Sequence, residues 1–137
     1  MNPLLLVTFA LQLSTPALDA DYRARNCADP MTQADMNACE AIDFQRADLE
    51  LNQVWREAIA AARRFDGELD RNIDTRPTYE TVLRAAQRAW LTYREEHCTW
   101  AGYQGARGGT MESMIYSGCL AALTRARTAA LREQSER

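Results

Sequence analysis

Apolar and polar residues recur along three stretches of the chain with the 3.6-residue period of an amphipathic helix. The first stretch begins after Thr32 and contains no proline or glycine before Gly67. Thr32, with Asp35 three residues later, is typical of a helix N-terminal cap. The positions predicted to form the buried side of this helix are Ala38, Ala41, Ile42, Phe44, Leu51, Trp55, Ile59 and Ala62.

A charged linker, residues 65–77, separates this helix from a second one predicted over residues 78–101. The glycine-rich segment GYQGARGGT, residues 102–110, ends the second helix because glycine favours flexible backbone. A third helix is predicted from Met111 or Glu112, with Thr110 as its candidate cap. The residues predicted to form the buried face of the second helix are Tyr79, Val82, Leu83, Ala86, Trp90, Tyr93, His97 and Trp100.

No segment shows the period-2 alternation of a β-strand, so the predicted fold class is all-α. We expect a small three-helix domain. The first two helices are predicted to form a long antiparallel pair, and the third to pack over their open groove.

The N-terminus reads as a secretory signal peptide, because an apolar run over residues 4–13 is followed by small residues. Cleavage is predicted after Ala17 or Ala20, which leaves residues 21–137 as a single domain. The alternative is a disordered apolar N-terminus, since the run has no preceding Lys or Arg. The apolar run is too short to span a bilayer, and no later segment is long enough. We therefore expect a periplasmic or secreted protein without a membrane span.

Four cysteines in an exported chain of this size suggest two disulfides. Three pairings are possible. We favour Cys27–Cys39 and Cys98–Cys119, because each closes a loop of about 13 to 22 residues, worth about 3 kcal/mol in the chain-entropy model. The spacing lacks a C-x2-C pair and the chain has one histidine, so we expect no metal site.

The formal net charge is -3 and the sequence pI is about 5.2. A mildly acidic surface argues against nucleic-acid binding and favours neutral or basic partners. The glycine-rich segment lacks the G-x-x-x-x-G-K-[ST] pattern of a phosphate loop, and we expect no cofactor.

A carboxylate at Asp48 falls on the apolar side of the first helix, where it needs a partner. Arg94, at the flank of the second helix's apolar face, has the reach and the planar donor group to pair with it. We expect a structural ion pair, and expect Asp48→Ala to cost about 3 kcal/mol by leaving Arg94 unpaired.

Two interpretations remain open for the aromatic residues of the second helix. Trp90, Tyr93 and Trp100 are predicted to lie in the core, and the alternative is a sugar-stacking platform on the surface. His97 is predicted to be a buried or half-buried residue with a hydrogen-bond partner. Its alternative role, as an acid or base in a small hydrolase, lacks an accompanying nucleophile motif.

The glycine-rich segment is the candidate for partner binding. Tyr103, Gln104 and Arg107 are predicted to be exposed on a mobile loop tethered by Cys98 and Cys119. Tyr and Arg are enriched at binding hot spots. The alternative is an ordinary solvated connection between helices.

Several short motifs resemble the small exported family of LprI-type lysozyme inhibitors over residues 27–131. These motifs are Met31-Thr32-Gln33, Met36-Asn37-x-Cys39, Asp48-x-x-Leu51-Asn52, Gln87-x-x-Trp90-x-x-Tyr93-Arg94, Cys98 and Cys119. The resemblance implies an extracytoplasmic helical domain with paired cysteines and, for some members, inhibition of lysozyme. Unlike anchored members, this chain has no lipidation cysteine after the predicted cleavage sites.

Together these features predict a protein-binding domain rather than an enzyme. Its expected activity is inhibition of a lysozyme or another peptidoglycan hydrolase by occlusion of the enzyme cleft. The alternative is a periplasmic structural or interaction module without a hydrolase target.

Overall fold

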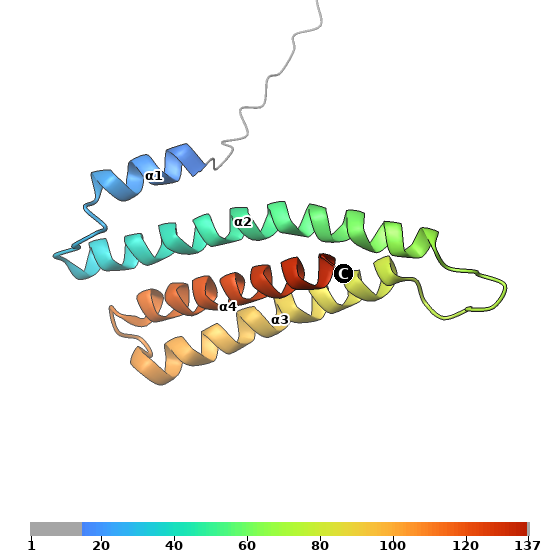
Figure 1. Ribbon diagram of the computed structural model, residues 1–137. Helices are drawn as coiled ribbons and strands as arrows, with labels where there is room; N and C mark the ends of the chain where they lie inside the picture. The colour runs from blue at the N-terminus through green and yellow to red at the C-terminus, as the bar shows by residue number, and fades with distance from the viewer. Residues whose placement is uncertain (1–14, 137) are drawn as a thin grey trace, which may run out of the picture.

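The computed structural model describes residues 15–136, and these residues form four helices and no strand. The helices are α1 (Thr15–Ala24), α2 (Gln33–Gly67), α3 (Tyr79–Ala106) and α4 (Glu112–Ser135). Figure 1 shows α2, α3 and α4 as an up-down-up bundle, with α1 lying along the outer side of α2. The all-α prediction is confirmed, but with four helices instead of three.

The additional helix, α1, packs onto α2 through apolar contacts and an ion pair. Leu18 is buried against Cys27, Cys39 and Ile42, and Arg46 on α2 lies 3.0 Å from the carboxylate of Asp19. The sequence patterns assigned the first part of this segment, up to Ala17 or Ala20, to the predicted signal peptide. The apolar run over residues 4–13 lies outside the described residues, whereas both candidate cleavage positions lie within α1.

Helix α2 begins at the predicted cap. The Thr32 hydroxyl oxygen accepts a hydrogen bond from the Asp35 N–H at 3.1 Å, and the hydroxyl donates to the Asp35 carboxylate at 2.7 Å. This exchange satisfies one of the free N–H groups at the start of a helix. The predicted start of the helix is confirmed, whereas the helix ends at Gly67, within the segment predicted to be the linker.

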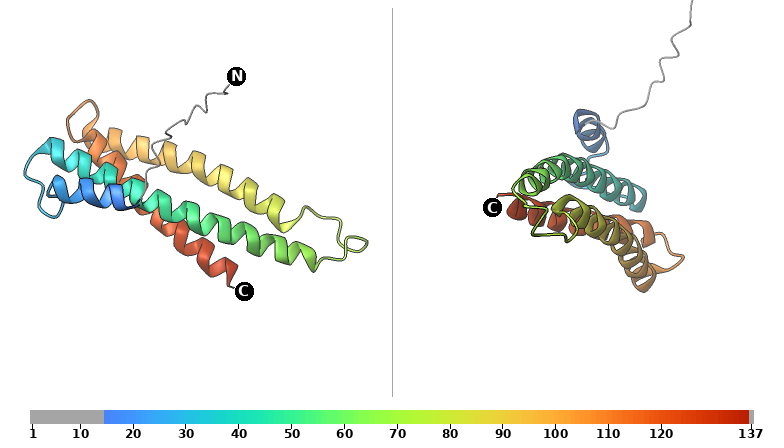
Figure 2. Two further views of the ribbon diagram at one scale, coloured as in Figure 1. Left: turned by 90° about the horizontal axis from the view of Figure 1, so that it is seen from above. Right: turned by 90° about the vertical axis from the view of Figure 1, so that its right-hand side faces the viewer.

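The packing order differs from the predicted pair of α2 and α3. Helix α4 makes the most contacts with α2 and also packs closely against α3, whereas α2 and α3 contact each other much less. Leu131 of α4 is buried against Leu51, Val54 and Ala58 of α2. Helix α4 is therefore central to the packing, since it lies against both α2 and α3, and Figure 1 shows it between them. Figure 2 shows the three helices side by side from two further directions.

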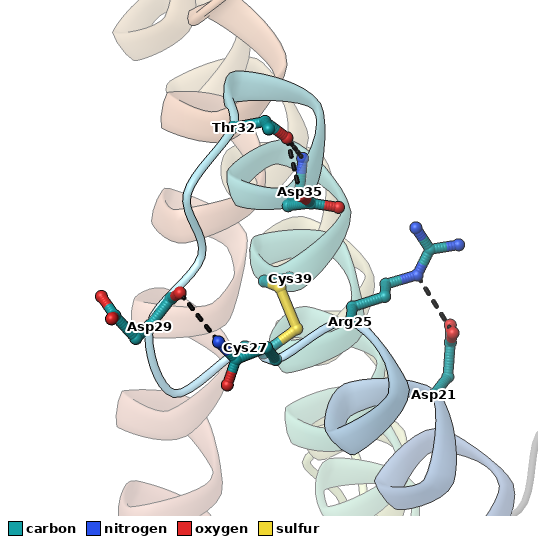
Figure 3. Close-up of a disulfide and its surroundings, with 8 residues drawn as sticks. Asp21, Arg25, Cys27, Asp29, Thr32, Asp35 and Cys39 are labelled. Carbon is teal, nitrogen blue, oxygen red and sulfur yellow. Dashed lines mark hydrogen bonds and ion pairs between the residues drawn. A yellow bond between two sulfur atoms is a disulfide. The ribbon is translucent and has the colours of Figure 1, made fainter.

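Both predicted disulfides are present. Cys27–Cys39 joins the segment after α1 to the first turns of α2, beside the Thr32 cap (Figure 3). Cys98–Cys119 joins α3 to α4. With every cysteine paired, the chain fits an oxidising compartment outside the cytoplasm. Among residues 15–136, none of the helices combines the length and the hydrophobicity that a bilayer-spanning segment requires.

Candidate partner-binding site

The glycine-rich segment forms a compact helical end instead of the predicted flexible loop. Helix α3 continues through Ala106, so Gly102 and Gly105 are helical. A β-carbon on Gly105 would lie 2.5 Å from the Ile115 side chain, and one on Gly102 would lie 3.3 Å from a backbone oxygen of α4. These glycines allow α3 and α4 to approach closely. The sequence pattern alone could not distinguish this role of glycine from that of a flexible loop.

The turn that joins α3 to α4 spans residues 107–111 and is held by hydrogen bonds. Gly108 has a φ of 76°, a conformation that glycine adopts without strain. Its N–H donates to the Glu112 carboxylate at 2.6 Å. The Asn37 side-chain amide donates to the Thr110 carbonyl at 2.9 Å. Helix α4 has no side-chain cap, so the predicted capping role of Thr110 was wrong, and this residue instead ties the turn to α2.

We use "turn end" for this part of the molecule, which comprises the last turn of α3, the turn and the first turn of α4. Tyr103 and Gln104 lie on α3, and Arg107 follows its last residue. All three residues are exposed. The Arg107 guanidinium lies over the Tyr103 ring at 4.4 Å, a cation–π contact that orders both side chains.

A groove of about 690 Å³ opens at the turn end beside Tyr103. Glu112 is the one charged residue among the described residues that line it. The lining residues are Asn37, Thr99, Gly102, Tyr103, Gly108, Gly109, Thr110, Glu112, Ser113 and Tyr116. The groove is therefore polar and weakly acidic, a chemistry suited to a basic or hydroxyl-rich side chain of a partner.

A polar network beneath the groove joins Tyr116 and Arg94 to Glu95, and the sequence patterns did not indicate it. The Tyr116 hydroxyl donates to Glu95 Oε2 at 2.6 Å, and Arg94 donates to Glu95 Oε1 at 3.0 Å. The hydrogen bond to Glu95, together with burial and the carboxylate charge, raises the pKa of Tyr116 to about 12. The network links α3 to α4 below the turn end.

The expected pair of Asp48 and Arg94 forms, with Arg94 Nη1 donating to Asp48 Oδ1 at 3.1 Å. Arg94 is 7% exposed. The same nitrogen donates to the Thr124 hydroxyl at 3.1 Å. The Arg94 guanidinium lies 5.1 Å from the ring of Phe44 and 5.1 Å from that of Trp90. Trp90 is half-buried and packs against the α2–α4 core. Arg94 is therefore a hub that connects α2, α3 and α4.

The predicted core positions of Tyr93 and Trp100 were wrong. Tyr93 is 53% exposed and Trp100 is 56% exposed. The half-buried His97 lies between them, its ring stacked on Tyr93 and its Nδ1 atom 3.4 Å from the Tyr93 hydroxyl oxygen. Its second ring neighbour is Trp100. The ring neighbours of His97 are thus aromatic, whereas the hydrolase alternative calls for a serine or cysteine nucleophile beside the histidine.

Comparison with known proteins assigns the chain to a family. The family model described as lysozyme inhibitor LprI matches residues 24–131. The chain belongs to the LprI lysozyme-inhibitor family. It is also 43% identical over 125 residues to the uncharacterized protein R02472 of Rhizobium meliloti (strain 1021), an alignment that covers 89% of this chain and 87% of the relative. No solved structure matches the chain significantly.

Family membership confirms the resemblance seen in the sequence motifs. At the level of the family, it supports a protein-binding inhibitor over an enzyme. Together with the two disulfides, it also indicates an exported protein. Within the described residues, no group of three or more His, Cys, Asp or Glu side chains is arranged to hold a metal ion.

Proposed function

We propose that this chain inhibits a lysozyme-type peptidoglycan hydrolase by covering or entering the enzyme's cleft with its turn end. The family match over residues 24–131 is the observation that carries the proposal. A periplasmic or secreted location, which both disulfides support, is where such an enzyme would be met.

The turn end suits this role because its exposed groups are held in place before binding. The Cys98–Cys119 disulfide joins the two helices below it, and Asn37 fixes the turn to α2. Arg107 and Tyr103 are already stacked on each other. Side chains ordered in the free protein lose less conformational entropy on binding. The contact residues in this proposal are Tyr103, Gln104 and Arg107.

The groove gives the contact a charge preference. Glu112 places a carboxylate in a lining that is otherwise uncharged among the described residues, and the whole chain carries a formal net charge of -3. A basic enzyme surface would be attracted to this acidic chain, which raises the association rate more than the final affinity. A lysine or arginine at the rim of the enzyme cleft is the group that the groove would receive.

A turbidity assay with purified, disulfide-intact protein tests the inhibition directly. We expect the wild-type chain to slow lysis of a peptidoglycan suspension by lysozyme, and Tyr103→Ala with Arg107→Ala to lose most of this effect. The matched control is Ile73→Ala, since Ile73 is 84% exposed and lies in the linker at the opposite end of the bundle. Full lysis at a large molar excess of wild-type protein would remove the inhibitor function and leave the structural-module alternative.

The composition of the chain allows the contact to be mapped by cross-linking. All 16 cationic side chains are arginines, so a carbodiimide cannot join its carboxylates to side-chain amines of its own. We expect cross-links from Glu112 to lysines of a bound lysozyme, and expect Glu112→Gln to abolish them. Cross-links confined to carboxylates of the 65–77 linker would place the contact at the other end of the molecule.

A further inference from the structure

One face of α3 carries an apolar stripe that the bundle leaves uncovered. Its members recur at spacings of three or four residues, which places them along one side of a helix. We call this the α3 stripe, and its residues are Tyr79, Val82, Ala86, Ala89, Tyr93, His97 and Trp100. Val82 and Trp100 are both 56% exposed. A row of this kind from Tyr79 to Trp100, roughly 33 Å of helix, marks an interaction surface.

The two halves of the α3 stripe differ in the size of their side chains. Apart from Tyr79, whose ring packs against that of Phe65, the N-terminal half presents smaller side chains. These are Val82, Ala86 and Ala89, whereas the C-terminal half presents Tyr93, His97 and Trp100. A groove of about 690 Å³ lies beside the N-terminal half, with Tyr79, Val82, Leu83 and Ala86 in its lining. The same helix therefore carries a hollow at one end and projecting aromatic side chains at the other.

We propose that two copies of this chain pair antiparallel through their α3 stripes, about a two-fold axis close to Ala89. In this arrangement Tyr93 of one copy faces Ala86 of the second, and His97 faces Val82. Trp100 of each copy enters the groove beside Tyr79 of the other. Each of the three aromatic side chains of the C-terminal half meets a small residue or a hollow, as in the knob-into-hole packing of paired helices. A two-fold pairing fills both grooves and closes the assembly as a dimer.

A parallel arrangement of the two α3 helices is disfavoured by the size of their side chains and by the charge of Glu96. In a parallel pair, the aromatic halves would meet each other, and the two grooves would stay empty. Glu96, at the edge of the α3 stripe, would then lie next to Glu96 of the second copy. The antiparallel pair separates these carboxylates by about 20 Å along the helix axis, beyond the Debye length of about 8 Å at physiological salt.

The test exchanges a small and a large residue across the proposed interface. We expect sedimentation of the disulfide-intact wild-type chain to show a monomer–dimer equilibrium. Ala86→Tyr should weaken dimerisation by about tenfold or more because two tyrosines collide, and Tyr93→Ala should weaken it similarly by leaving a gap. The double variant, Ala86→Tyr with Tyr93→Ala, restores one large and one small residue at each contact and should regain most of the wild-type affinity.

The matched control is Ala60→Tyr, which adds the same side chain at an exposed position of α2 and should leave the dimer intact. Unchanged circular dichroism and melting temperature of each variant would show that the bundle is folded. A wild-type chain that stays monomeric up to its solubility limit would overturn the proposal, as would a double variant weaker than both single variants. A monomer that loses lysozyme inhibition on Tyr93→Ala would also overturn it, by assigning the α3 stripe to the enzyme.

Discussion

Replacement of Arg94 by alanine tests whether this buried side chain holds the three bundle helices together. Its guanidinium donates hydrogen bonds to Asp48 on α2, to Thr124 on α4 and to Glu95 on its own helix. It also fills the space beside the ring of Trp90. Truncation to alanine removes all of these contacts at once and opens a cavity between the helices.

The expected loss of stability follows from how exposed each partner is. Asp48 and Glu95 have side-chain exposures of 37% and 47%. Water can therefore hydrogen-bond to their carboxylates and replace part of the lost interaction with Arg94. Thr124 is fully buried and finds no such replacement. Adding the lost packing against Trp90, we expect Arg94→Ala to lower the free energy of unfolding by about 3–4 kcal/mol.

Removal of the Asp48 carboxylate should lower the free energy of unfolding much less than Arg94→Ala does. In Asp48→Ala, Arg94 keeps its bonds to Thr124 and Glu95. The expected loss is about 1–2 kcal/mol, which is lower than the value of about 3 kcal/mol expected from the sequence for an isolated pair. The sequence did not reveal the two additional partners of Arg94, and these reduce its dependence on Asp48.

Equilibrium unfolding in urea, followed by far-UV circular dichroism with disulfides intact, measures these differences. Arg125→Ala is the matched control, because Arg125 also bridges two helices but pairs with Asp43 at the surface. An exposed pair of this kind contributes about 0–1 kcal/mol. If Arg94→Ala destabilised the protein no more than Arg125→Ala, Arg94 would not be the hub of the bundle.

Three further predictions concern a disulfide, a helix cap and the ionisation of a tyrosine. Replacing both Cys98 and Cys119 with serine should lower the free energy of unfolding by about 3 kcal/mol in the chain-entropy model, measured by the same urea titration. Thr32→Ala should cost about 1 kcal/mol through the lost cap, seen as a lower melting temperature. The pKa of Tyr116, raised to about 12 by its bond to Glu95, lies above its unfolded value of about 10. The hydrogen bond from Tyr116 to Glu95 therefore stabilises the folded state fully below about pH 10, and this stabilisation is lost as the pH rises toward 12. Spectroscopic titration of phenolate should show one late-ionising tyrosine that disappears in Tyr116→Phe.

The helices of the bundle and its two disulfides could be predicted because each leaves a local signal in the sequence. Thr32 and Asp35 mark the start of α2, and the spacing of the cysteines favoured the two observed pairs. The central place of α4 left no such signal, since its contacts depend on the whole bundle. At the turn end, Gly102 and Gly105 were interpreted as flexible because sequence alone does not show which residues approach them.

The face that α3 buries was predicted wrongly, and the reason lies in its polar residues. Hydrophobicity alone favoured Tyr93 and Trp100 as core residues. The structure instead buries Gln87, Arg94, Cys98 and Gly102. Each has a specific reason to be inside. Gln87 accepts a hydrogen bond from Arg127 at 2.9 Å, Arg94 meets three acceptors, Cys98 is bonded to α4, and Gly102 lets α4 approach.

Partner groups on α2 and α4 therefore decide the rotation of α3 about its own axis. A buried arginine is costly only when it lacks partners, and here it has them on both neighbouring helices. The disulfide at Cys98 fixes the same rotation covalently. With that rotation set, the aromatic side of α3 has to lie outside the bundle, whatever its hydrophobicity. The apolar pattern that misdirected the prediction of the core is thus the same pattern that makes α3 suited to a second copy of the chain.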